Sequence, residues 1–500
     1  MKNAIPAAFL ALWTAALCTP QAARLLSERT GRPAFEPFPS RTENRRQNPW
    51  PDLFEKAPRK VPHSLYGRAL ENWYHDRYAW RTELIRFGRR VSFEWLQAPV
   101  GRDVPGLDGW RFMRITWREL EDYLGAIPLD DAAIAEWVAL FEARHAWAEA
   151  VGTSVMTLLA APKAQVRWQQ LRPGVRDRRG RRIADQLRDA LADSPARDDV
   201  LFVDEDLAAA FAAGREVFFY EDHHPCPHGI WVLYERLNRR LRELHPERVG
   251  ESIPWFDDPP PEVRAGLAPG CWEENRRLVV SSPGERQDDG TIPHDAARYP
   301  YCNVQTVRDG GGLTVVMGHD SFMRFTLSSW LGGDGSVRFP FARGVGRVRA
   351  FLFHRLSPGF LEWETRSSVP EAFVEQFPEF RLAEARGGGF MDASFRAAAV
   401  FARAEEPAPG AAPPPGAKIA ARAVFDGVAT DAPGAKSCTA VLEAGGRELG
   451  RRPVSPGFRR AVFFDPAEPA AGAALSVRLE GGSAASTNLV WRLVRQGAAR

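Results

Sequence analysis

Two short segments of the chain combine side chains that could carry out nucleophilic catalysis. Asp222 and His224 stand two residues apart within the run 220–224, and Ser321 stands within the run 318–322. A serine hydroxyl attacks a carbonyl group when a histidine removes its proton and a carboxylate orients that histidine. Residues two apart in an extended segment point to the same side, so Asp222 could hold the His224 ring with its second nitrogen facing the serine. The spacing is therefore compatible with a catalytic triad of Ser321, His224 and Asp222.

The same segments permit two other interpretations. Asp222, His223, His224 and His228 form a cluster of metal-ligating residue types, which His319 could complete as a further ligand. Alternatively, the serine could serve only as the N-cap of a helix, with the histidines in a solvated loop. Spacing alone does not separate a triad, a metal site and a structural role.

The serine and the acid–histidine pair each follow a predicted strand. The apolar run 313–317 precedes Ser321, which begins a helical pattern, and the run 217–220 precedes Asp222. The first N–H groups of a helix have no partner within the helix and could stabilise an oxyanion. In parallel sheets ligands bind at the carboxyl ends of the strands, so we expect both segments to meet at that edge.

Strands and helices alternate along the middle of the chain. The patterns predict strands over 153–160, 200–203, 217–220, 313–317, 348–353 and 360–363. They predict helices over 70–96, 132–151, 183–191, 207–213 and 229–244. Such alternation is typical of an α/β fold with a mostly parallel sheet and helices on both faces. Towards the C-terminus, runs of alternating apolar and polar residues separated by turn-forming clusters predict a β-sandwich.

Composition divides the chain into parts with different roles. They are 1–23 as a signal peptide or membrane anchor, 24–60 as an extended tether, 61–404 as the α/β domain, 405–418 as a Pro-rich linker and 419–500 as the β-sandwich. Lys2 and the apolar run 4–17 are typical of a secretory signal, and this run is shorter than the about 20 residues of a full membrane span. We therefore expect an extracytoplasmic protein.

Charge and cysteine content narrow the functional classes. The formal net charge of +3 on a chain of 500 residues gives no reason to expect a nucleic-acid partner. The cysteines after the N-terminal segment show no metal-binding spacing, and a disulfide among Cys226, Cys271 and Cys302 is plausible in an exported chain. No motif indicates a cofactor.

The catalytic segments also resemble a known family. Asp320-Ser321-Phe322 after a strand is similar to the Gly-Asp-Ser block of SGNH and GDSL esterases, although here Asp-x-His precedes the serine. That reversed order resembles the alginate O-acetyltransferase family, whose SGNH arrangement is circularly permuted. The resemblance extends over about residues 64–370. Its other motifs are the entry segment 70–81, the turn Leu107-Asp108-Gly109-Trp110-Arg111-Phe112 and the strand end Ala161-Pro162-Lys163.

Two departures from the family pattern stand near the site. His319 separates Gly318 from Asp320, and Pro225-Cys226-Pro227 stands where a tryptophan often follows the family histidine. The second departure puts the wall of the site in doubt, but not the triad.

The resemblance implies an SGNH-like O-acetyltransferase of the periplasm or cell envelope, either secreted or anchored. Its serine would take an acetyl group from a membrane-bound O-acyltransferase and pass it to hydroxyls of an exopolysaccharide, with no metal or cofactor. The sandwich would resemble a carbohydrate-binding module. Two alternatives stay open: a carbohydrate acetyl esterase with the same triad, and a non-catalytic polysaccharide-binding assembly protein.

Further residues are candidates for substrate binding. Lys163 and Arg366 follow predicted strands and could bind an anionic sugar or polarise an ester, although a solvated surface position is an equal alternative. Tyr301 and Asn303 precede the serine strand and could approach the site. We expect Asp320 to shape the turn before the serine rather than to react.

Overall fold

The structure is a computed structural model, which describes most of the chain from residue 103 onward. The described residues are 22, 29, 87–88, 91–96, 103–113, 118–220, 222–252, 302–306, 312–324, 344–352, 355–383, 392–409, 411–431, 435 and 437–494, with backbone alone for 93–94, 227, 302–306, 321, 324, 352 and 394. The chain forms two compact units, 1–105 and 106–500. Apart from residues 22 and 29, the predicted signal and tether lie outside the described residues, as does most of the predicted helix 70–96.

The first unit contributes only short described elements. These are a π-helical turn, η1 (Val91–Trp95), and a strand, β1 (Asp103–Pro105). Among the described residues of the whole chain, no helix combines the length and the apolar character needed to cross a bilayer.

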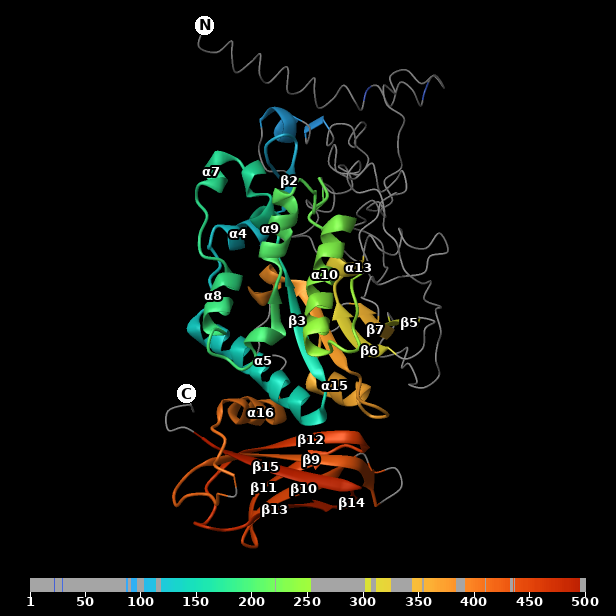
Figure 1. Ribbon diagram of the computed structural model, residues 1–500. Coiled ribbons are helices and arrows are strands. Elements are labelled where there is room, and N and C mark those ends of the chain that lie inside the picture. Colours follow the sequence, from blue (N-terminus) through green and yellow to red (C-terminus); the bar gives the residue numbers. More distant parts are fainter. Residues whose placement is uncertain are drawn as a thin grey trace. The chain divides into compact units, whose positions relative to one another are not determined.

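A six-stranded sheet forms the centre of the second unit, in the order β4-β3-β8-β6-β7-β5 (Figure 1). Its strands are β3 (Ser154–Ala160), β4 (Val200–Phe202), β5 (Cys302–Thr306), β6 (Leu313–His319), β7 (Val345–Leu352) and β8 (Ala372–Pro378). All neighbours are parallel except β5, which runs antiparallel to β7. The central strands β3 and β8 are buried along nearly their whole length, as expected for parallel strands covered on both faces.

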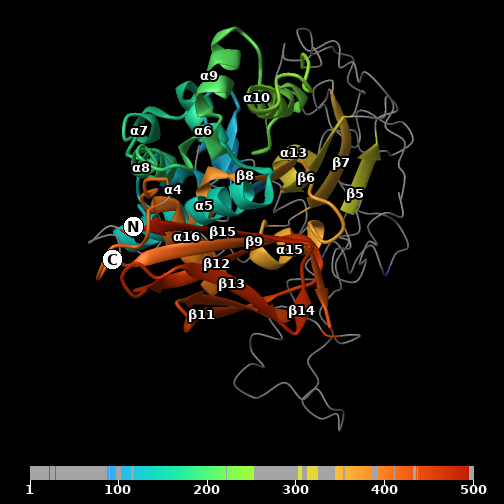
Figure 2. The same cartoon turned by 60° about the horizontal axis from the view of Figure 1, so that its bottom comes forward.

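Helices cover both faces of this sheet. The described helices of the second unit are α4 (Glu119–Tyr123), α5 (Asp131–Val151), α6 (Lys163–Val166), α7 (Pro173–Arg176), α8 (Ile183–Ala190), α9 (Asp204–Ala212), α10 (Pro227–Leu244), α13 (Ser321–Arg324), α15 (Pro358–Glu364) and α16 (Ala393–Arg403). Short 3₁₀ turns stand at η2 (Trp168–Gln170), η3 (Arg197–Asp199) and η4 (Glu379–Ala383), and a short strand β2 (Arg111–Met113) follows the turn at 106–110. Helix α5 lies on one face and α10 on the other (Figures 1 and 2). The predicted α/β fold with a mostly parallel sheet is confirmed.

Two predicted strands are wrong, and two strands of the six-stranded sheet were not predicted. The run 217–220 does not join the sheet. Among the described residues, its one strand-like pairing is an isolated bridge between Phe218 and Pro225. The run 360–363 lies in helix α15, which begins at Pro358 with the Ser357 hydroxyl accepting the Phe360 N–H. Strands β5 and β8 carry polar residues among their apolar ones, which hid them from a search for apolar runs.

A β-sandwich follows the α/β domain, as predicted. Its strands are β9 (Ile419–Thr430), β10 (Cys438–Ala444), β11 (Arg447–Val454), β12 (Gly457–Ala467), β13 (Leu475–Glu480), β14 (Gly482–Ser483) and β15 (Ser486–Leu493). One sheet has the order β11-β10-β13, and the other has β9 at its centre, paired with β12, β14 and β15. Alternate residues of β9 face the interior of the sandwich, where Ala421, Ala423 and Phe425 pack together.

The other face of β9 and β12 is buried against the α/β domain. Ala420, Val424 and Phe463 belong to the same hydrophobic core as Phe401 of α16 and Trp147 of α5. Helix α16 packs between α5 and the sandwich, as Figure 1 shows. The Pro-rich run 405–418 therefore joins two parts that share one core.

The sandwich meets the α/β domain at the amino ends of its parallel strands. Arg422 forms an ion pair with Glu149 over 3.5 Å, just before β3 begins. The Arg460 guanidinium donates to the Thr365 hydroxyl over 2.9 Å, and the Phe458 N–H donates to the Arg366 carbonyl over 3.0 Å, both ahead of β8. The sandwich and the carboxyl edge of the sheet are thus at opposite ends of the strands.

Phe463→Ala should destabilise the whole second unit. Its ring is buried in the shared core, so truncation should lower the free energy of unfolding by about 3–5 kcal/mol. Phe458→Ala is the matched control on the same strand, because 55% of that side chain is exposed; its effect should stay within about 0.5 kcal/mol. Urea unfolding followed by tryptophan fluorescence measures both. Equal effects of the two substitutions would contradict the shared core.

The structure also bears on the expected disulfide. Cys226 is a buried free thiol whose Sγ donates to the Glu216 carbonyl over 3.2 Å. A pair that includes Cys226 is therefore wrong. Cys271 and the side chain of Cys302 lie outside the described residues.

Candidate active site

The predicted acid and base lie at the tip of a tight loop beside α10. The Phe219 N–H donates to the His224 carbonyl over 3.2 Å, and the Cys226 N–H donates to the Val217 carbonyl over 3.0 Å, which close the loop at its base. Gly229 in the first turn of α10 allows this closure, because a Cβ there would lie 2.0 Å from the Val217 oxygen. The loop therefore presents residues 222–224 at a fixed place above the helix.

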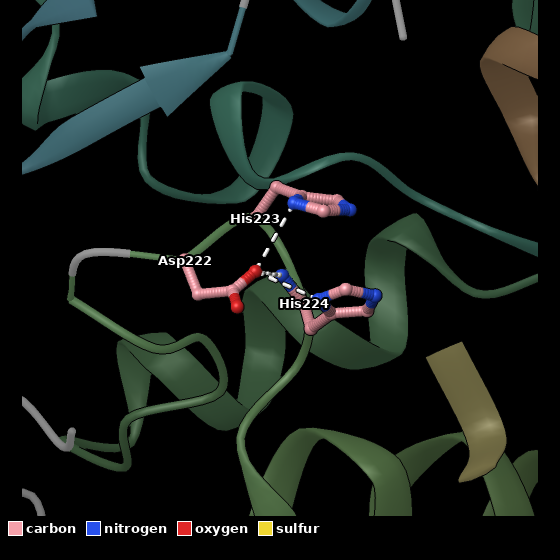
Figure 3. A group of neighbouring side chains, drawn as sticks. All are labelled: Asp222, His223 and His224. Carbon is pink, nitrogen blue, oxygen red and sulfur yellow. Dashed lines mark hydrogen bonds and ion pairs between the residues drawn. The ribbon is translucent and has the colours of Figure 1, made fainter. Parts of the chain in front are cut away.

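One carboxylate oxygen of Asp222 gathers three donors. Its Oδ1 lies 2.7 Å from His224 Nδ1, 3.0 Å from His223 Nδ1 and 3.1 Å from the His224 backbone N–H (Figure 3). A histidine that donates its Nδ1–H to a carboxylate has its lone pair on Nε2, the state of a general base. Nε2 of His224 points away from Asp222 in Figure 3. The prediction that Asp222 orients His224 agrees with this geometry.

The charges of the loop suit such a base. Partial burial favours protonation of Asp222, but the hydrogen bonds from His223 and His224 outweigh it and hold the pKa of this carboxyl well below its usual range. Burial lowers the pKa of His223, against the opposing hydrogen bond to Asp222. At neutral pH the loop therefore combines an ionised carboxylate with an uncharged His223.

The serine segment reaches the same place from the other side. Ser321 is the first residue of α13, directly after β6 ends at His319. The ring of the next residue, Phe322, lies 5.4 Å from the His224 ring and 5.8 Å from the His223 ring, centre to centre. Two segments far apart in the sequence thus meet at the carboxyl edge of the sheet. The Ser321 side chain lies outside the described atoms, so its distance from His224 stays a prediction.

Asp320 shapes the turn before Ser321, as expected. Its Oδ1 accepts the Phe322 N–H over 2.8 Å, and its own N–H donates to Gln376 Oε1 of β8 over 3.2 Å. Burial raises the pKa of Asp320 to about 6, against the Phe322 N–H and the Arg381 guanidinium. Because the Phe322 and Met323 N–H groups both bond to Asp320, the first-turn amides expected to hold an oxyanion already have partners, and that expectation is wrong for these two.

The alternative metal site has part of its geometry. The ligand atoms of Asp222, His223 and His224 lie within 4.8 Å of one another, which a divalent ion such as zinc could bridge. His228 and His319 are not part of this group: His228 is buried against Trp231, and His319 Nδ1 lies 2.9 Å from the Asp320 carbonyl. The geometry of the three residues suits both a hydrogen-bonded base and a metal site, so chemistry has to separate them.

The candidate substrate residues lie in very different places. Lys163 is fully buried, and its ammonium donates to three backbone carbonyls. Arg366 follows helix α15 and not a strand, and its guanidinium stacks on Trp363 beside the sandwich, at the amino edge. Asn303 lies in β5, paired with Ala350, with only its backbone described. Tyr301 lies outside the described residues.

Three contacts around the acid–histidine loop were not predicted. The Trp110 and Tyr220 rings meet edge to face at 5.4 Å, and the Tyr220 hydroxyl donates to the Asp108 carbonyl over 2.8 Å. Phe322 covers both histidine rings. Trp110 stands in a turn motif and Tyr220 stands two positions before Asp222, so both residues could have been singled out from the sequence. Nothing in the sequence linked them to each other.

Comparisons with known proteins add structural neighbours. No protein-family model and no curated protein matches the chain. Solved structures that match it include the O-acetyltransferase domain of Pseudomonas putida AlgJ, with 18% identity over 60% of this chain and 99% of that one and a TM-score of 0.35. Pseudomonas aeruginosa AlgX matches with 13% identity over 79% of this chain and 95% of that one, at a TM-score of 0.31.

A third match comes from a different bacterium. Bacillus cereus PatB1, solved with a sulfonyl adduct, has 11% identity over 59% of this chain and 100% of that one, at a TM-score of 0.31. At these TM-scores the matches carry no weight for function, which depends on the residues of the site itself.

Proposed function

We propose that the protein is an O-acetyltransferase that passes an acetyl group through Ser321 to a hydroxyl of a polysaccharide. The observation that carries the proposal is the bond from His224 Nδ1 to Asp222, which leaves Nε2 as a base beside the helix that Ser321 begins. The order of these residues along the chain and the motifs around them support the same chemistry.

The reaction follows from the roles of the three residues. His224 Nε2 takes the Ser321 proton as Oγ attacks the acetyl carbonyl, and the collapsing intermediate expels the donor alcohol, which leaves with that proton. An acceptor hydroxyl then gives its proton to Nε2 and attacks the acetyl-serine, and Ser321 recovers the proton as it leaves. Asp222 keeps the histidine in one tautomer and stabilises its charged form in both halves.

The setting of the reaction is part of the proposal. The N-terminal signal pattern favours the periplasm or the cell envelope, outside the cytoplasm and its soluble acetyl donors. The acetyl donor is then a membrane-bound O-acyltransferase, and the acceptor is an exopolysaccharide. No metal or cofactor takes part.

The decisive experiment measures where the acetyl group goes. Purified full-length protein is given a small acetyl ester with and without an oligosaccharide, and both acetylated sugar and free acetate are measured. We expect acetylated sugar in excess over acetate, with unchanged turnover in EDTA. Acetate alone would instead identify a carbohydrate acetyl esterase, and binding without turnover would identify an assembly protein. Activity lost in EDTA and restored by zinc would favour the metal site.

A further inference from the structure

The ammonium of Lys163 joins two backbone segments around the candidate active site. Its Nζ donates to the carbonyls of Arg111 over 2.6 Å, Tyr220 over 2.9 Å and Asp222 over 3.0 Å. Two of these carbonyls belong to the acid–histidine loop and one belongs to the segment after the turn at 106–110. Because an amine has three N–H groups only in its charged form, three acceptors require a protonated lysine.

Nearby aromatic rings and carboxylates favour the charged form of Lys163, and burial opposes it. Its Nζ lies 4.9 Å from the centre of the Trp110 ring and 5.4 Å from that of Phe112, at cation–π distance. Burial lowers the pKa of Lys163, and the carboxylates of Glu119 and Asp222 oppose this shift. Glu119 in turn accepts the N–H of Ala164, the residue after the lysine, over 2.6 Å.

The turn that receives the loop has its own sequence requirement. Asp108 and Gly109 both have left-handed backbones, with φ of 52° and 79°. A Cβ at Gly109 would lie 1.7 Å from the Tyr220 hydroxyl oxygen, so only glycine lets the tyrosine reach the Asp108 carbonyl. The Arg111 N–H also donates to the Tyr220 carbonyl, over 3.3 Å. The turn therefore packs against the loop in one way, with the Tyr220 ring over Gly109 and its hydroxyl on the Asp108 carbonyl.

We propose that Lys163 is a positioning residue for the triad, because its ammonium ties the acid–histidine loop to strand β2, directly after the turn at 106–110, and so holds Asp222 where it orients His224. The proposal rests on the proposed function and replaces the expectation that Lys163 binds substrate. It also gives one physical role to three separate motifs, the turn, the strand end with its lysine and the Asp-x-His pair. They meet at one ammonium group.

The test is a double-mutant cycle in the full-length protein. Lys163→Met keeps the length of the side chain and removes all three donors, and it should lower kcat for a small acetyl ester by roughly 10²-fold with little change in KM, since misplacement of catalytic groups acts on kcat. In an Asp222→Asn background the same change should cost less than about threefold, because the group that it positions is already lost. Lys418→Met, at the end of the Pro-rich run just before β9, is the control for removing a lysine charge.

A second readout does not depend on activity. Nitrogen-15 NMR of the histidine rings reports the tautomer of His224, which we expect to be Nδ1–H in the native protein and a mixture in Lys163→Met. Should that variant not fold, Tyr220→Phe loosens the same loop by removing the bond to Asp108 and should shift the tautomer in the same direction, with a smaller loss of kcat.

The possible results separate this inference from the proposed function. A folded Lys163→Met protein with native kcat, or one whose loss is equal in the Asp222→Asn background, overturns the positioning role. A raised KM with native kcat would return Lys163 to substrate binding. A native level of activity in Ser321→Ala would overturn the proposed function, while the tautomer of His224 would still test the role of Lys163.

Discussion

Ser321→Ala should abolish acetyl transfer while leaving the protein folded. Members of a triad act as one unit, so turnover of a small acetyl ester should fall on the order of 10³-fold or more. The turn itself depends on Asp320, whose carboxylate accepts the Phe322 N–H, so removing the Ser321 hydroxyl should cost at most about 1 kcal/mol of stability. Steady-state kinetics and thermal unfolding on the same preparation measure the two effects.

The matched control for this substitution is Ser357→Ala. Ser357 caps helix α15 and accepts the Phe360 N–H, far from the catalytic edge. It should cost similar stability and no activity. A Ser321→Ala protein that keeps most of its turnover would mean that the nucleophile lies elsewhere, and one that unfolds would mean that Ser321 is chiefly structural.

His224→Ala and His223→Ala should differ strongly, although both rings contact the same oxygen of Asp222. Loss of the base should lower kcat by about 10³-fold, within the range of general acid–base catalysis. His223 takes part in no step of the mechanism, so the fall in kcat for His223→Ala should be at least about 10-fold smaller than the fall for His224→Ala. Single-turnover kinetics with a chromogenic acetyl ester compare the two variants directly.

The pair also separates the triad from the metal site. Both histidines would be ligands of a metal ion, and either substitution would then abolish activity together with metal binding. In the triad, the double variant of Ser321→Ala and His224→Ala should be little worse than either single one. Equal and complete losses for His223 and His224 would therefore count against the mechanism.

Local pattern was enough for several elements around the catalytic residues, but not for the run 217–220 before Asp222, which does not join the sheet. The apolar runs that became β3 and β6 and the helical periods of α5 and α10 were all predicted, because each buries a continuous apolar face. The Asp-x-His spacing predicted the bond between Asp222 and His224, since neighbours in the chain need little tertiary information to meet.

Long-range pairing explains what the pattern missed. Strand β8 contains Glu375, a residue that argues against a central strand until Arg144 of α5, far away in sequence, is seen to bind it. Burial favours protonation of Glu375, but Arg144 and Arg355 outweigh it and lower its pKa to about 2. Likewise, Lys163 ranked as a surface or substrate residue because its three carbonyl partners lie more than fifty positions away along the chain. Every residue has a backbone carbonyl, so residue type does not indicate which carbonyl accepts a hydrogen bond from a distant side chain.

The sandwich lies at the amino ends of the strands, and this has a consequence for a long substrate. A seven-residue strand such as β3 spans roughly 20 Å at about 3.3 Å per residue, so sandwich and serine are separated by at least that length of rigid protein. A saccharide held by the sandwich could not also be the unit that is acetylated. It would have to be a distant part of the same polymer, running along the outside of the domain. A sandwich that binds saccharide would then be a second, non-catalytic binding site that keeps a polymer near the enzyme between turnovers. The enzyme would modify one long polymer repeatedly, in preference to short oligosaccharides.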